Sequence, residues 1–538
     1  MPPTHEVTNQ PPPLLDHDVA AGDAALVEGM ARYGADPGPV RVLGELAGTE
    51  RVQRWAAEAN GYPPVLRTHD RYGNRIDEVD FHPAWHELMR VAVGAGLHGT
   101  PWASTAPAAH FTRAAGFYVW SQVEAGHGCP VSMTYAAVPA LRAEPSLAAT
   151  YLPGLASTAY EPGLRLAVGK AGLLAGMGMT EKQGGSDVRA NTTRAVPDSA
   201  GGYRLTGHKW FCSAPMCDLF LVLAQVGAGP TCFLVPRVLP DGDRNTFRLQ
   251  RLKDKLGNRS NASAEVEFEQ TVGWRVGPEG RGMPTILEMV TATRLDCVLG
   301  SAAAIRAATA QAIHHATHRR AFGRPLREQP LMQAVLADLA VESEAATALA
   351  LRLASTVDSG PPGLGRLATA VAKFWVCKRA AVVTAEALEC LGGNGYVEES
   401  GMPRLYREAP LNSIWEGSGN VIALDVLRAL ARQPESVAAF SAEVEAASGA
   451  DDRLDAAVKR LRAELADPDR IEARARRVAS LMALCLQGSL LVRHAPAAVA
   501  DAFCATRLDG DWGWVLGTLP VGLDTKAIVD RAAPTPDR

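Results

Sequence analysis

A short β-rich segment interrupts an otherwise helical chain, and this change constrains the fold more than any other feature. Alanine- and leucine-rich sequence with polar residues at helical intervals fills residues 16–172 and returns from residue 283. Residues 177–282 instead contain short β-rich runs, among them Leu219–Leu223, Thr231–Val235 and Ala264–Phe268. The last run alternates charged and apolar side chains, which is typical of a half-buried antiparallel strand. The sequence therefore predicts a mostly α-helical protein with an inserted antiparallel β-domain.

Changes in composition and glycine- or proline-rich breaks divide the chain into four predicted domains. They are an N-terminal helical domain (1–175), a middle β-domain (176–282), a helical bundle (283–432) and a C-terminal helical domain (433–538). A chain of 538 residues is long enough for several domains of about 100–200 residues. In the predicted bundle Met332, Val335, Leu336 and Leu339 follow helical spacing, which indicates one apolar helix face packed on a partner.

Composition excludes several classes of protein. Hydrophobic residues make up 47% and charged residues 21%, so global disorder is excluded. Lys and Arg total 54 against 58 Asp and Glu, so no general basic field attracts nucleic acid. Nine cysteines without C-x-x-C spacing argue for a reducing compartment and against a disulfide framework or a zinc site. Because the first residues lack a signal-peptide pattern and no run of about 18 apolar residues occurs, we expect a cytoplasmic protein.

Two motifs belong to the β-rich segment. Met177–Asp187 contains paired glycines with hydroxyl side chains nearby, which suits the polar edge of a ring or a phosphate. Gly207–Ser213 places aromatic side chains beside a serine, which suits the wall of a flat heteroaromatic ring. Taken alone, the first motif is also compatible with an ordinary β-turn, and the second with a half-buried aromatic strand.

A third motif combines the glycine-rich turn Leu391–Tyr396 with the later segment Asn412–Asn420. Glu416 is the one charged residue between Leu411 and Leu424, so it is a candidate carboxylate base whose pKa an apolar pocket would raise. The alternative is a carboxylate that stabilises the N-terminus of the helix that follows.

A fourth motif, His318–Arg324, is basic. Arg319 and Arg324 offer forked donors suited to a pyrophosphate, although a solvated helix end also explains them. His314 and His318 are four residues apart, as metal ligands on one helix face are, but no H-E-x-x-H pattern and no third ligand accompany them. No metal site is predicted.

Taken together and in this order, the four motifs resemble the acyl-CoA dehydrogenase superfamily over about residues 16–430. That family has a helical domain, a β-barrel-like domain and a second helical bundle, with a flavin at their junction. The matching positions are Glu181, Gly185, Ser186 and Asp187 in its middle-domain flavin motif, Arg319, Phe322, Gly323 and Gln329 in its cross-subunit cofactor motif, Leu391–Gly395 in its glycine-rich turn, and Trp415–Ser418 in its catalytic loop.

A narrower branch is more similar still, namely the AidB-like flavoproteins of the adaptive response to DNA alkylation. The stretches that carry this resemblance are Met177–Asp187, Gly207–Phe211, Arg251–Ala262, Pro403–Glu408 and Asn412–Asn420. These proteins have an extra C-terminal helical domain, which the residues after Gln433 would supply. The resemblance implies FAD and a homotetramer, because the cofactor is completed across a subunit interface.

The resemblance also implies roles for individual residues. Glu416 would take the α-proton of a thioester whose oxygen its own backbone N–H polarises, while the β-hydride goes to the flavin. Catalysis is assigned to Glu416 and Arg294, and cofactor binding to Met177, Met179, Thr180, Gly185, Ser186, Phe211, Ser213, Arg319, Phe322, Gln329, Gly392, Gly393, Gly395, Ile414, Trp415, Gly417, Ser418 and Asn420.

Three positions depart from the family pattern. Lys182 and Gln183 replace a proline and a glycine, and Trp415 replaces the tyrosine before the base, which narrows the acyl pocket. The alternative base position holds Thr293, before Arg294, so Glu416 is the candidate. Three hypotheses stay open: an acyl-CoA dehydrogenase, of which a short-chain enzyme without a DNA role is one form; a nucleic-acid-associated flavoprotein; and an oxygen-using flavin oxidase or monooxygenase.

Binding to double-stranded DNA would depend on the C-terminal domain. Arg470, Arg474 and Arg477 are spaced i, i+4 and i+7, which predicts one basic helix face for phosphates. The alternative is a solvated face whose arginines pair with nearby acids, including Glu464 and Asp467.

Overall fold

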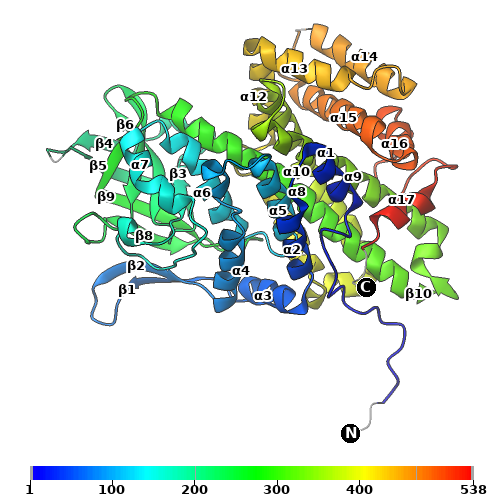
Figure 1. Ribbon diagram of the computed structural model, residues 1–538, viewed down its shortest axis with the longest axis horizontal. Coiled ribbons are helices and arrows are strands. Elements are labelled where there is room, and N and C mark those ends of the chain that lie inside the picture. Colours follow the sequence, from blue (N-terminus) through cyan, green and yellow to red (C-terminus); the bar gives the residue numbers. More distant parts are fainter. Residues whose placement is uncertain (1–3, 200, 468, 535–538) are drawn as a thin grey trace. The chain divides into compact units, whose positions relative to one another are not determined.

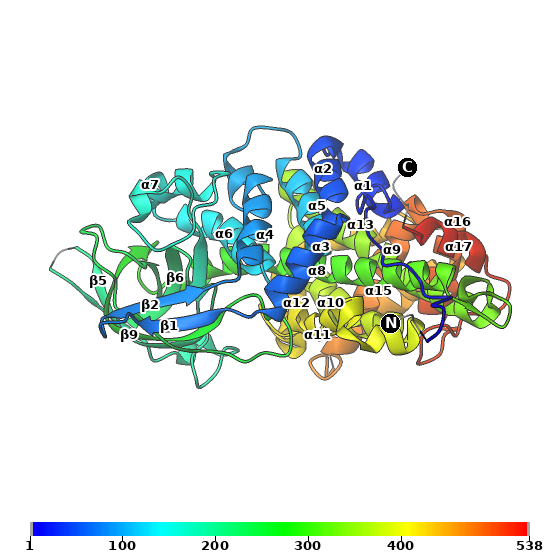
Figure 2. The same cartoon turned by 90° about the horizontal axis from the view of Figure 1, so that it is seen from below.

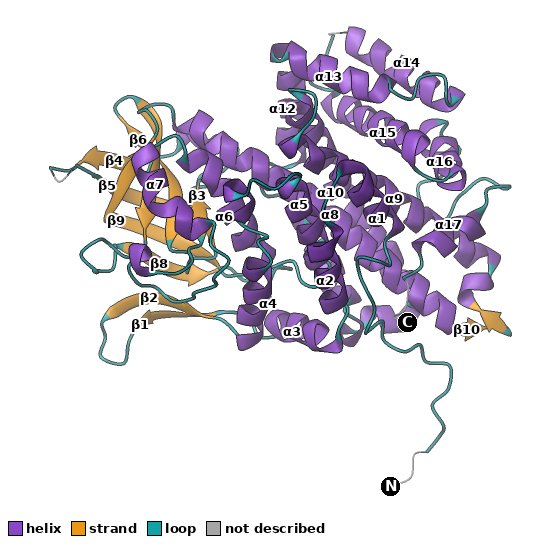
Figure 3. Cartoon of the chain, viewed as in Figure 1, coloured by secondary structure: helices purple, strands orange, loops and turns teal. Residues whose placement is uncertain are grey.

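The computed structural model describes residues 4–199, 201–467 and 469–534. Their contacts divide the chain into two compact units. One comprises residues 54–117 and 124–296 and is called the barrel unit below. The other comprises residues up to 53, residues 118–123 and residues from 297 onward, and is called the bundle unit. Helices dominate the chain, and its main sheet lies in the middle of the sequence, so the predicted fold class is confirmed (Figures 1 and 3).

The barrel unit is built on a seven-stranded sheet. Its strands are β3 (Ala175–Gly178), β4 (Arg194–Pro197), β5 (Tyr203–Ser213), β6 (Leu219–Val226), β7 (Gly229–Pro236), β8 (Phe247–Leu252) and β9 (Ser263–Val276). The order is β3-β6-β4-β5-β9-β7, with β8 on β9, and pairing of β6 with β7 closes the sheet on itself. Most pairs are antiparallel as predicted, whereas β3 and β4 each run parallel to β6.

The predicted strands are present, and one of them departs from simple alternation. β6, β7 and β9 contain the three β-rich runs. Along β9, Val266 and Phe268 are buried and Glu267 is exposed, as period two requires. Glu265 is nevertheless buried, because Arg251 and Lys253 each bind its carboxylate at 2.7 Å. A charged residue therefore faces inward where it has two counter-charges.

Helices of the same unit precede and follow the sheet in the sequence. They are α3 (Glu50–Gly61, whose first turn belongs to the bundle unit), α4 (Pro83–Gly94), α5 (Ala109–Ser121, shared between the units), α6 (Gly128–Leu141), α7 (Pro145–Leu155) and the start of α8 (Gly282–His318). α6 is apolar on all sides and almost entirely buried, which is typical of a core helix.

A two-stranded hairpin, β1 (Val65–His69) and β2 (Arg75–Asp80), lies in the region predicted to be helical. Its turn is closed by Asp70, whose carboxylate accepts N–H groups from Tyr72 and Asn74. No residue of β1 is buried, so the strand has no apolar face from which its period could be recognised.

The bundle unit is helical apart from a short hairpin, β10 (Arg320–Ala321) and β11 (Arg324–Pro325). Its helices are α1 (Ala24–Tyr33), α2 (Pro37–Ala47), the rest of α8, α9 (Pro330–Asp358), α10 (Leu364–Cys390), α11 (Met402–Glu408), α12 (Gly419–Arg432), α13 (Pro434–Glu445), α14 (Asp452–Ala466), α15 (Ala475–His494), α16 (Ala497–Phe503) and α17 (Thr525–Ala532). Leu336 and Leu339 of the predicted stripe are fully buried where α9 packs on α10.

The C-terminal helices pack directly on the central helices of this unit. α13 and α15 contact α10, and α15 and α17 contact α9 (Figure 2). Among the described residues α15 is the one helix long and apolar enough to span a membrane, and 67% of its most apolar stretch is buried within the protein. It therefore has the burial of a core helix.

A buried arginine joins the C-terminal region to α9. The side chain of Arg507 is 1% exposed and binds the Glu342 carboxylate at 2.9 Å together with that of Asp338. Asp338 also accepts the indole N–H of Trp512 at 3.1 Å and the backbone N–H of Gly517 at 2.8 Å. Burial alone would lower the pKa of Arg507, but the two carboxylates outweigh burial and raise it. The segment after α16 is thus fixed to α9 by charge-assisted bonds.

We expect Arg507→Met to destabilise the protein by about 3–5 kcal/mol, because it leaves the buried Asp338 carboxylate without its counter-charge, whereas Glu342 keeps Arg379 at 3.1 Å. Urea unfolding followed by circular dichroism measures the change. Arg462→Met is the matched control, since Arg462 and Glu445 form an exposed pair worth less than about 1 kcal/mol. Equal losses in the two variants would contradict the role of Arg507.

Candidate active site

The two motifs of the barrel unit meet at the ends of β3 and β5. The backbone N–H of Trp210 donates to the carbonyl of Thr180 at 2.8 Å, which joins the segment after β3 to β5. Phe211 is 50% exposed although it lies in a central strand. Ser213 is half-buried, and its hydroxyl lies 3.1 Å from that of Ser263. An open aromatic face beside hydroxyl groups suits a flat heteroaromatic ring with a polar edge.

A buried ion pair fixes the backbone beneath these side chains. Glu181 and Lys209 are both fully buried, with Nζ and Oε1 2.8 Å apart. Glu181 also accepts the backbone N–H groups of Thr192 at 2.7 Å and Thr193 at 3.1 Å. Burial alone would raise the pKa of the Glu181 carboxyl, but the hydrogen bond and charge of Lys209 outweigh it and hold the pKa well below its ordinary value. Glu181 therefore has a structural role in the interior, whereas Thr180 and Lys182 on either side of it are half-buried and exposed, respectively.

The paired glycines of this motif form the predicted turn. Glu181 and Gly184 exchange backbone hydrogen bonds, and Gly184 has a φ of 148°. A Cβ at Gly185 would lie 2.6 Å from the Thr180 hydroxyl oxygen, so a side chain there would displace Thr180. Ser186 is exposed next to this turn, and Met177 and Met179 are half-buried before it.

The bundle unit contributes the loop that carries Glu416. Glu416 has a φ of 57° and Gly417 a φ of 108°, so two successive residues adopt left-handed backbone. α12 begins at Gly419 and has no acidic residue in its first turn, so Glu416 lies outside the helix it was alternatively expected to stabilise. Glu416 therefore lies in a loop with left-handed backbone, three residues before α12.

The rest of the loop is held by side-chain hydrogen bonds. The indole N–H of Trp415 donates to the Asn412 side chain at 2.8 Å, and Asn412 donates to the hydroxyl of Ser301 on α8 at 3.1 Å. Ile414 and Ser418 are exposed on either side of Trp415 and Glu416. The indole ring is therefore fixed within the loop.

Arg294 belongs to the part of α8 that lies in the barrel unit, and its side chain is half-buried. Two residues later, Asp296 forms a buried bidentate pair with Arg113 of α5, with Nη2 and Oδ2 2.8 Å apart. This pair fixes α8 against α5 next to Arg294. Thr293, at the alternative base position, is buried and bonds the carbonyl of Val290.

The basic motif and the glycine-rich turn are brought together by the N-terminal segment, and no pattern in the sequence predicts this contact. Arg319 donates through Nη1 to the carbonyl of Asn9 at 2.7 Å, and Asn394 donates to the side chain of Gln10 at 3.2 Å. These contacts use a backbone carbonyl and an amide, so no charge pattern in the sequence marks them.

Most of the remaining residues of these two motifs lie at the surface, and Gly395 is the exception among those assigned to the cofactor. Arg324 binds the side chain of Gln329 at 3.1 Å, and Phe322, at the tip of the β10–β11 hairpin, is 97% exposed. Gly392 and Gly393 are exposed, whereas Gly395 is buried against Leu388, where a Cβ would clash with a carbonyl.

The prediction that Arg470, Arg474 and Arg477 lie on one face of a helix is wrong. α14 ends at Ala466 and α15 begins at Ala475, so Arg470 and Arg474 lie in the connecting turns, where Arg470 has a φ of 51°. Arg474 and Arg477 both bind the Glu464 carboxylate, at 2.5 and 2.7 Å. The alternative of arginines paired with nearby acids therefore describes these two residues.

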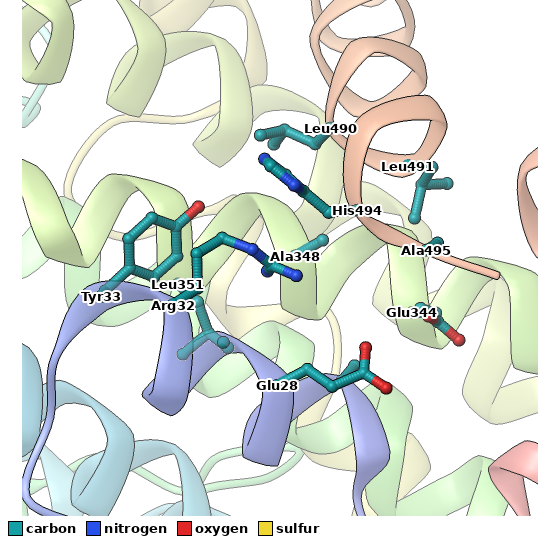
Figure 4. A pocket seen from close by; sticks show the side chains of 12 residues that line it. Glu28, Arg32, Tyr33, Glu344, Ala348, Leu351, Leu490, Leu491, His494 and Ala495 are labelled. Atoms are coloured by element: carbon teal, nitrogen blue, oxygen red, sulfur yellow. The ribbon is translucent and has the colours of Figure 1, made fainter.

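Two cavities, each within a single unit, contain none of the motif residues. One, of 520 Å³, lies in the barrel unit between α4 and the segment after β5, and Trp85, Tyr160 and Met216 line it. The other, of 20 Å³, lies in the bundle unit between α1, α9 and α15, with Arg32, Glu344 and His494 around it (Figure 4). The smaller has room for about one water molecule.

We expect the barrel unit to lose stability in acid through Glu181. A lowered carboxyl pKa stabilises the folded state above the ordinary value of 4.5, and this contribution is lost as pH falls further. Lys209→Met should cost about 3–5 kcal/mol near neutral pH by leaving a buried carboxylate unpaired. It should also remove the acid loss that comes from Glu181, because burial without Lys209 raises the pKa of this carboxyl and protonation then relieves the folded state. Thermal unfolding midpoints between pH 3 and pH 7 measure both effects, on the order of a few degrees per kcal/mol.

The adjacent Lys182→Met is the control for that experiment. Lys182 is half-exposed and lies 4.0 Å from the exposed Glu267. A Lys209→Met protein with the same acid profile as Lys182→Met would show that the buried pair does not support the motif.

Comparison with protein families agrees with this arrangement. Residues 9–162 match the N-terminal domain of the adaptive response protein AidB. Residues 176–271 match the middle domain of acyl-CoA dehydrogenases, and residues 280–431 match their C-terminal domain. The three matches cover both motif-bearing regions and end at residue 431.

Two curated relatives extend over most of the chain. A putative acyl-CoA dehydrogenase AidB of Escherichia coli K12 is 47% identical over 514 residues, which cover 94% of this chain and 95% of the relative. Acyl-CoA dehydrogenase family member 11 of Caenorhabditis elegans is 30% identical over 87% of this chain and 83% of its own length.

Solved structures show the same fold. The C. elegans protein ACDH-11, solved in complex with C11-CoA, has a TM-score of 0.84 at 27% identity and covers 98% of this chain and 97% of its own. A Bacillus anthracis acyl-CoA dehydrogenase solved with FAD has a TM-score of 0.60 at 19% identity, which shows the fold, and covers 84% of this chain and 79% of its own. The exposed Phe211 face with its neighbouring hydroxyls fits a flavin ring. The chain therefore belongs to the acyl-CoA dehydrogenase family, in its AidB branch, and is an FAD-dependent acyl-CoA dehydrogenase-type oxidoreductase.

Proposed function

We propose that this protein dehydrogenates an acyl-CoA thioester with Glu416 as the base that removes the α-proton. The observation that carries the proposal is the left-handed backbone of Glu416, with a φ of 57°, in a loop without other charged residues. Left-handed backbone at a residue other than glycine costs about 1–3 kcal/mol and is concentrated at functional sites. Bound FAD supplies the acceptor for the β-hydride.

The same loop would orient the substrate. The backbone N–H of Glu416 is proposed to polarise the thioester oxygen, as an oxyanion-type donor. Trp415, fixed by its hydrogen bond to Asn412, would form one wall of the acyl pocket and favour small acyl groups. The complex of the related ACDH-11 with C11-CoA supports an acyl-CoA as the substrate class.

Cofactor binding is proposed for residues from both units. In the barrel unit Thr180, Phe211 and Ser213 would hold the flavin ring, and Ser186 would bind a polar part of the cofactor. In the bundle unit Ser418 and Asn420 would also bind polar parts of the cofactor. Phe211 and Ser186 are exposed, so a bound cofactor could contact them.

A homotetramer is proposed because the basic motif would complete the cofactor site of a neighbouring subunit. Arg319 uses Nη1 for its bond to Asn9, and its other guanidinium nitrogens form no hydrogen bond among the described residues. Phe322, 97% exposed at the hairpin tip, offers an apolar surface for a neighbouring subunit.

We expect Glu416→Gln to retain FAD and lose acyl-CoA-driven bleaching of the flavin by about 10²–10⁴-fold, because an amide cannot accept the α-proton. Anaerobic stopped-flow absorbance with a panel of acyl-CoA thioesters measures the rate. Glu399→Gln, at an exposed glutamate, is the control and should bleach at the wild-type rate. Unchanged bleaching in Glu416→Gln would overturn the base assignment. Reduced wild-type flavin whose colour returns rapidly when oxygen is admitted would favour the oxidase alternative.

We also propose a cytoplasmic role in the response to DNA alkylation. The support is the match to the AidB N-terminal domain and the 47% identity to the E. coli relative. All nine cysteines are free and buried, which agrees with a reducing compartment. Double-stranded DNA is proposed to bind the C-terminal domain near Arg470, Arg474 and Arg477, although the Glu464 carboxylate neutralises part of this charge.

If these arginines contact DNA, Glu464→Gln should strengthen low-salt retention of duplex DNA, because it releases Arg477 for a phosphate, while Arg474 keeps Asp467 at 3.1 Å. The expected gain is several-fold, with the salt dependence steeper by about one phosphate contact. Fluorescence anisotropy at several salt concentrations measures both. Glu445→Gln releases Arg462 and changes the net charge equally, so it is the matched control. Equal gains in both variants, or no retention in any, would contradict this DNA site.

A further inference from the structure

Lys373 is a buried lysine in the middle of α10 that the proposed reaction does not use. Its side chain is 1% exposed. The ammonium donates to the backbone carbonyl of Gly417 at 2.8 Å and to that of Asn412 at 3.1 Å. It forms no ion pair with a carboxylate anywhere in the described chain. Burying an ammonium is costly. Among the described residues, the hydrogen bonds to the two loop carbonyls are what compensates this cost for Lys373.

The two carbonyls lie at the two ends of the catalytic loop. Asn412 is in the turn that precedes Trp415, and Gly417 follows Glu416 directly. One ammonium therefore binds both ends of the segment that contains the proposed base. The side chain of Asn412 adds the bonds to Ser301 and Trp415, so the first end of the loop is held on α8 as well.

The left-handed backbone of Glu416 requires such support. A non-glycine residue with a φ of 57° is less stable than in the usual backbone regions, and it persists only when its surroundings determine it. No hydrogen bond within α12 supplies this, because the helix starts two residues after Gly417. Lys373 binds the carbonyl of Gly417, and Gly417 is the residue directly after Glu416, whose backbone is left-handed.

We propose that Lys373 is a positioning residue for the reaction, whose ammonium closes the loop from Asn412 to Gly417 on α10 and thereby fixes Glu416 in its left-handed conformation. This inference rests on the proposed role of Glu416 as the base. Lys373 acts through the loop backbone, so its effect on the reaction passes through Glu416.

The kinetic test uses the FAD-loaded protein and Lys373→Met, which keeps the length of the side chain and removes its charge and donors. We expect acyl-CoA-driven bleaching to slow by about 10²-fold, the order of loss produced by an ångström-scale displacement of a catalytic group. The flavin content and the dissociation constant for the acyl-CoA should change little. Lys373→Gln retains a donor without the charge and should lose less activity, and it serves as the second variant if Lys373→Met does not fold.

A double-variant comparison separates positioning from general destabilisation. If Lys373 acts through Glu416, Lys373→Met combined with Glu416→Gln should bleach at the rate of Glu416→Gln alone. Thr384→Val is the matched control on α10, because the Thr384 hydroxyl bonds only carbonyls of its own helix. It should lower the thermal midpoint and keep the wild-type bleaching rate. Full loss of activity by Thr384→Val, or an additive loss in the double variant, would overturn the proposal.

A spectroscopic readout makes this inference independent of the base assignment. Fluorine NMR of the 5-fluorotryptophan protein, with the Trp415 resonance assigned by Trp415→Phe, reports the loop position with FAD bound and no substrate present. We expect that resonance to shift in Lys373→Met and to stay in place in Thr384→Val. A shift accompanied by normal bleaching in Glu416→Gln would leave Lys373 as the loop anchor and reject Glu416 as the base. An unmoved resonance in Lys373→Met would overturn the anchoring itself.

Discussion

Buried lysines that bind backbone carbonyls hold the irregular segments on which the site depends. Lys209 of β5 pairs with Glu181 at 2.8 Å and reaches the carbonyl of Met179 at 3.4 Å, which fixes the turn in the barrel unit. Lys373 of α10 bonds two carbonyls of the catalytic loop in the bundle unit. In each case a regular element supplies the lysine and an irregular segment supplies the acceptors. Because an unsatisfied buried ammonium is costly, the segment keeps the one arrangement that satisfies it.

Apolar packing and buried charges have different roles in the two units. In the barrel unit the sheet closes through pairing of β6 with β7, and Phe211 of β5 is exposed near Ser213. In the bundle unit α9 and α10 provide buried apolar faces, while charged contacts decide which loop lies where. Arg507 shows the same principle beyond the catalytic loop, since it ties the segment after α16 to Asp338 and Glu342. Apolar burial stabilises the fold, and buried charges select its irregular conformations.

Sequence patterns predicted the features that have a period and missed those that depend on single contacts. β6 and β7 were predicted from their apolar runs and β9 from its alternation of charged and apolar side chains, whereas β1 has no buried face to reveal it. The spacing of Arg470, Arg474 and Arg477 imitates a helix face, yet the chain turns there. Glu416 stood out as a lone charge in an uncharged loop. Its left-handed backbone and the lysine that holds it are 43 residues apart in sequence, so no local pattern connects them.

The C-terminal helices extend to the segment that follows the catalytic loop. Arg476 of α15 donates to the side chain of Asn420 at 3.0 Å, and its guanidinium lies 5.7 Å from the ring centre of Phe374. Phe374 is the neighbour of Lys373 in the sequence, and Asn420 lies in the first turn of α12. The residues matched to the acyl-CoA dehydrogenase C-terminal domain end at 431, so this arginine comes from outside the shared family core. A domain added to the family architecture thus contacts both the helix that anchors the loop and the helix that follows it, which makes the C-terminal region part of the support for the site.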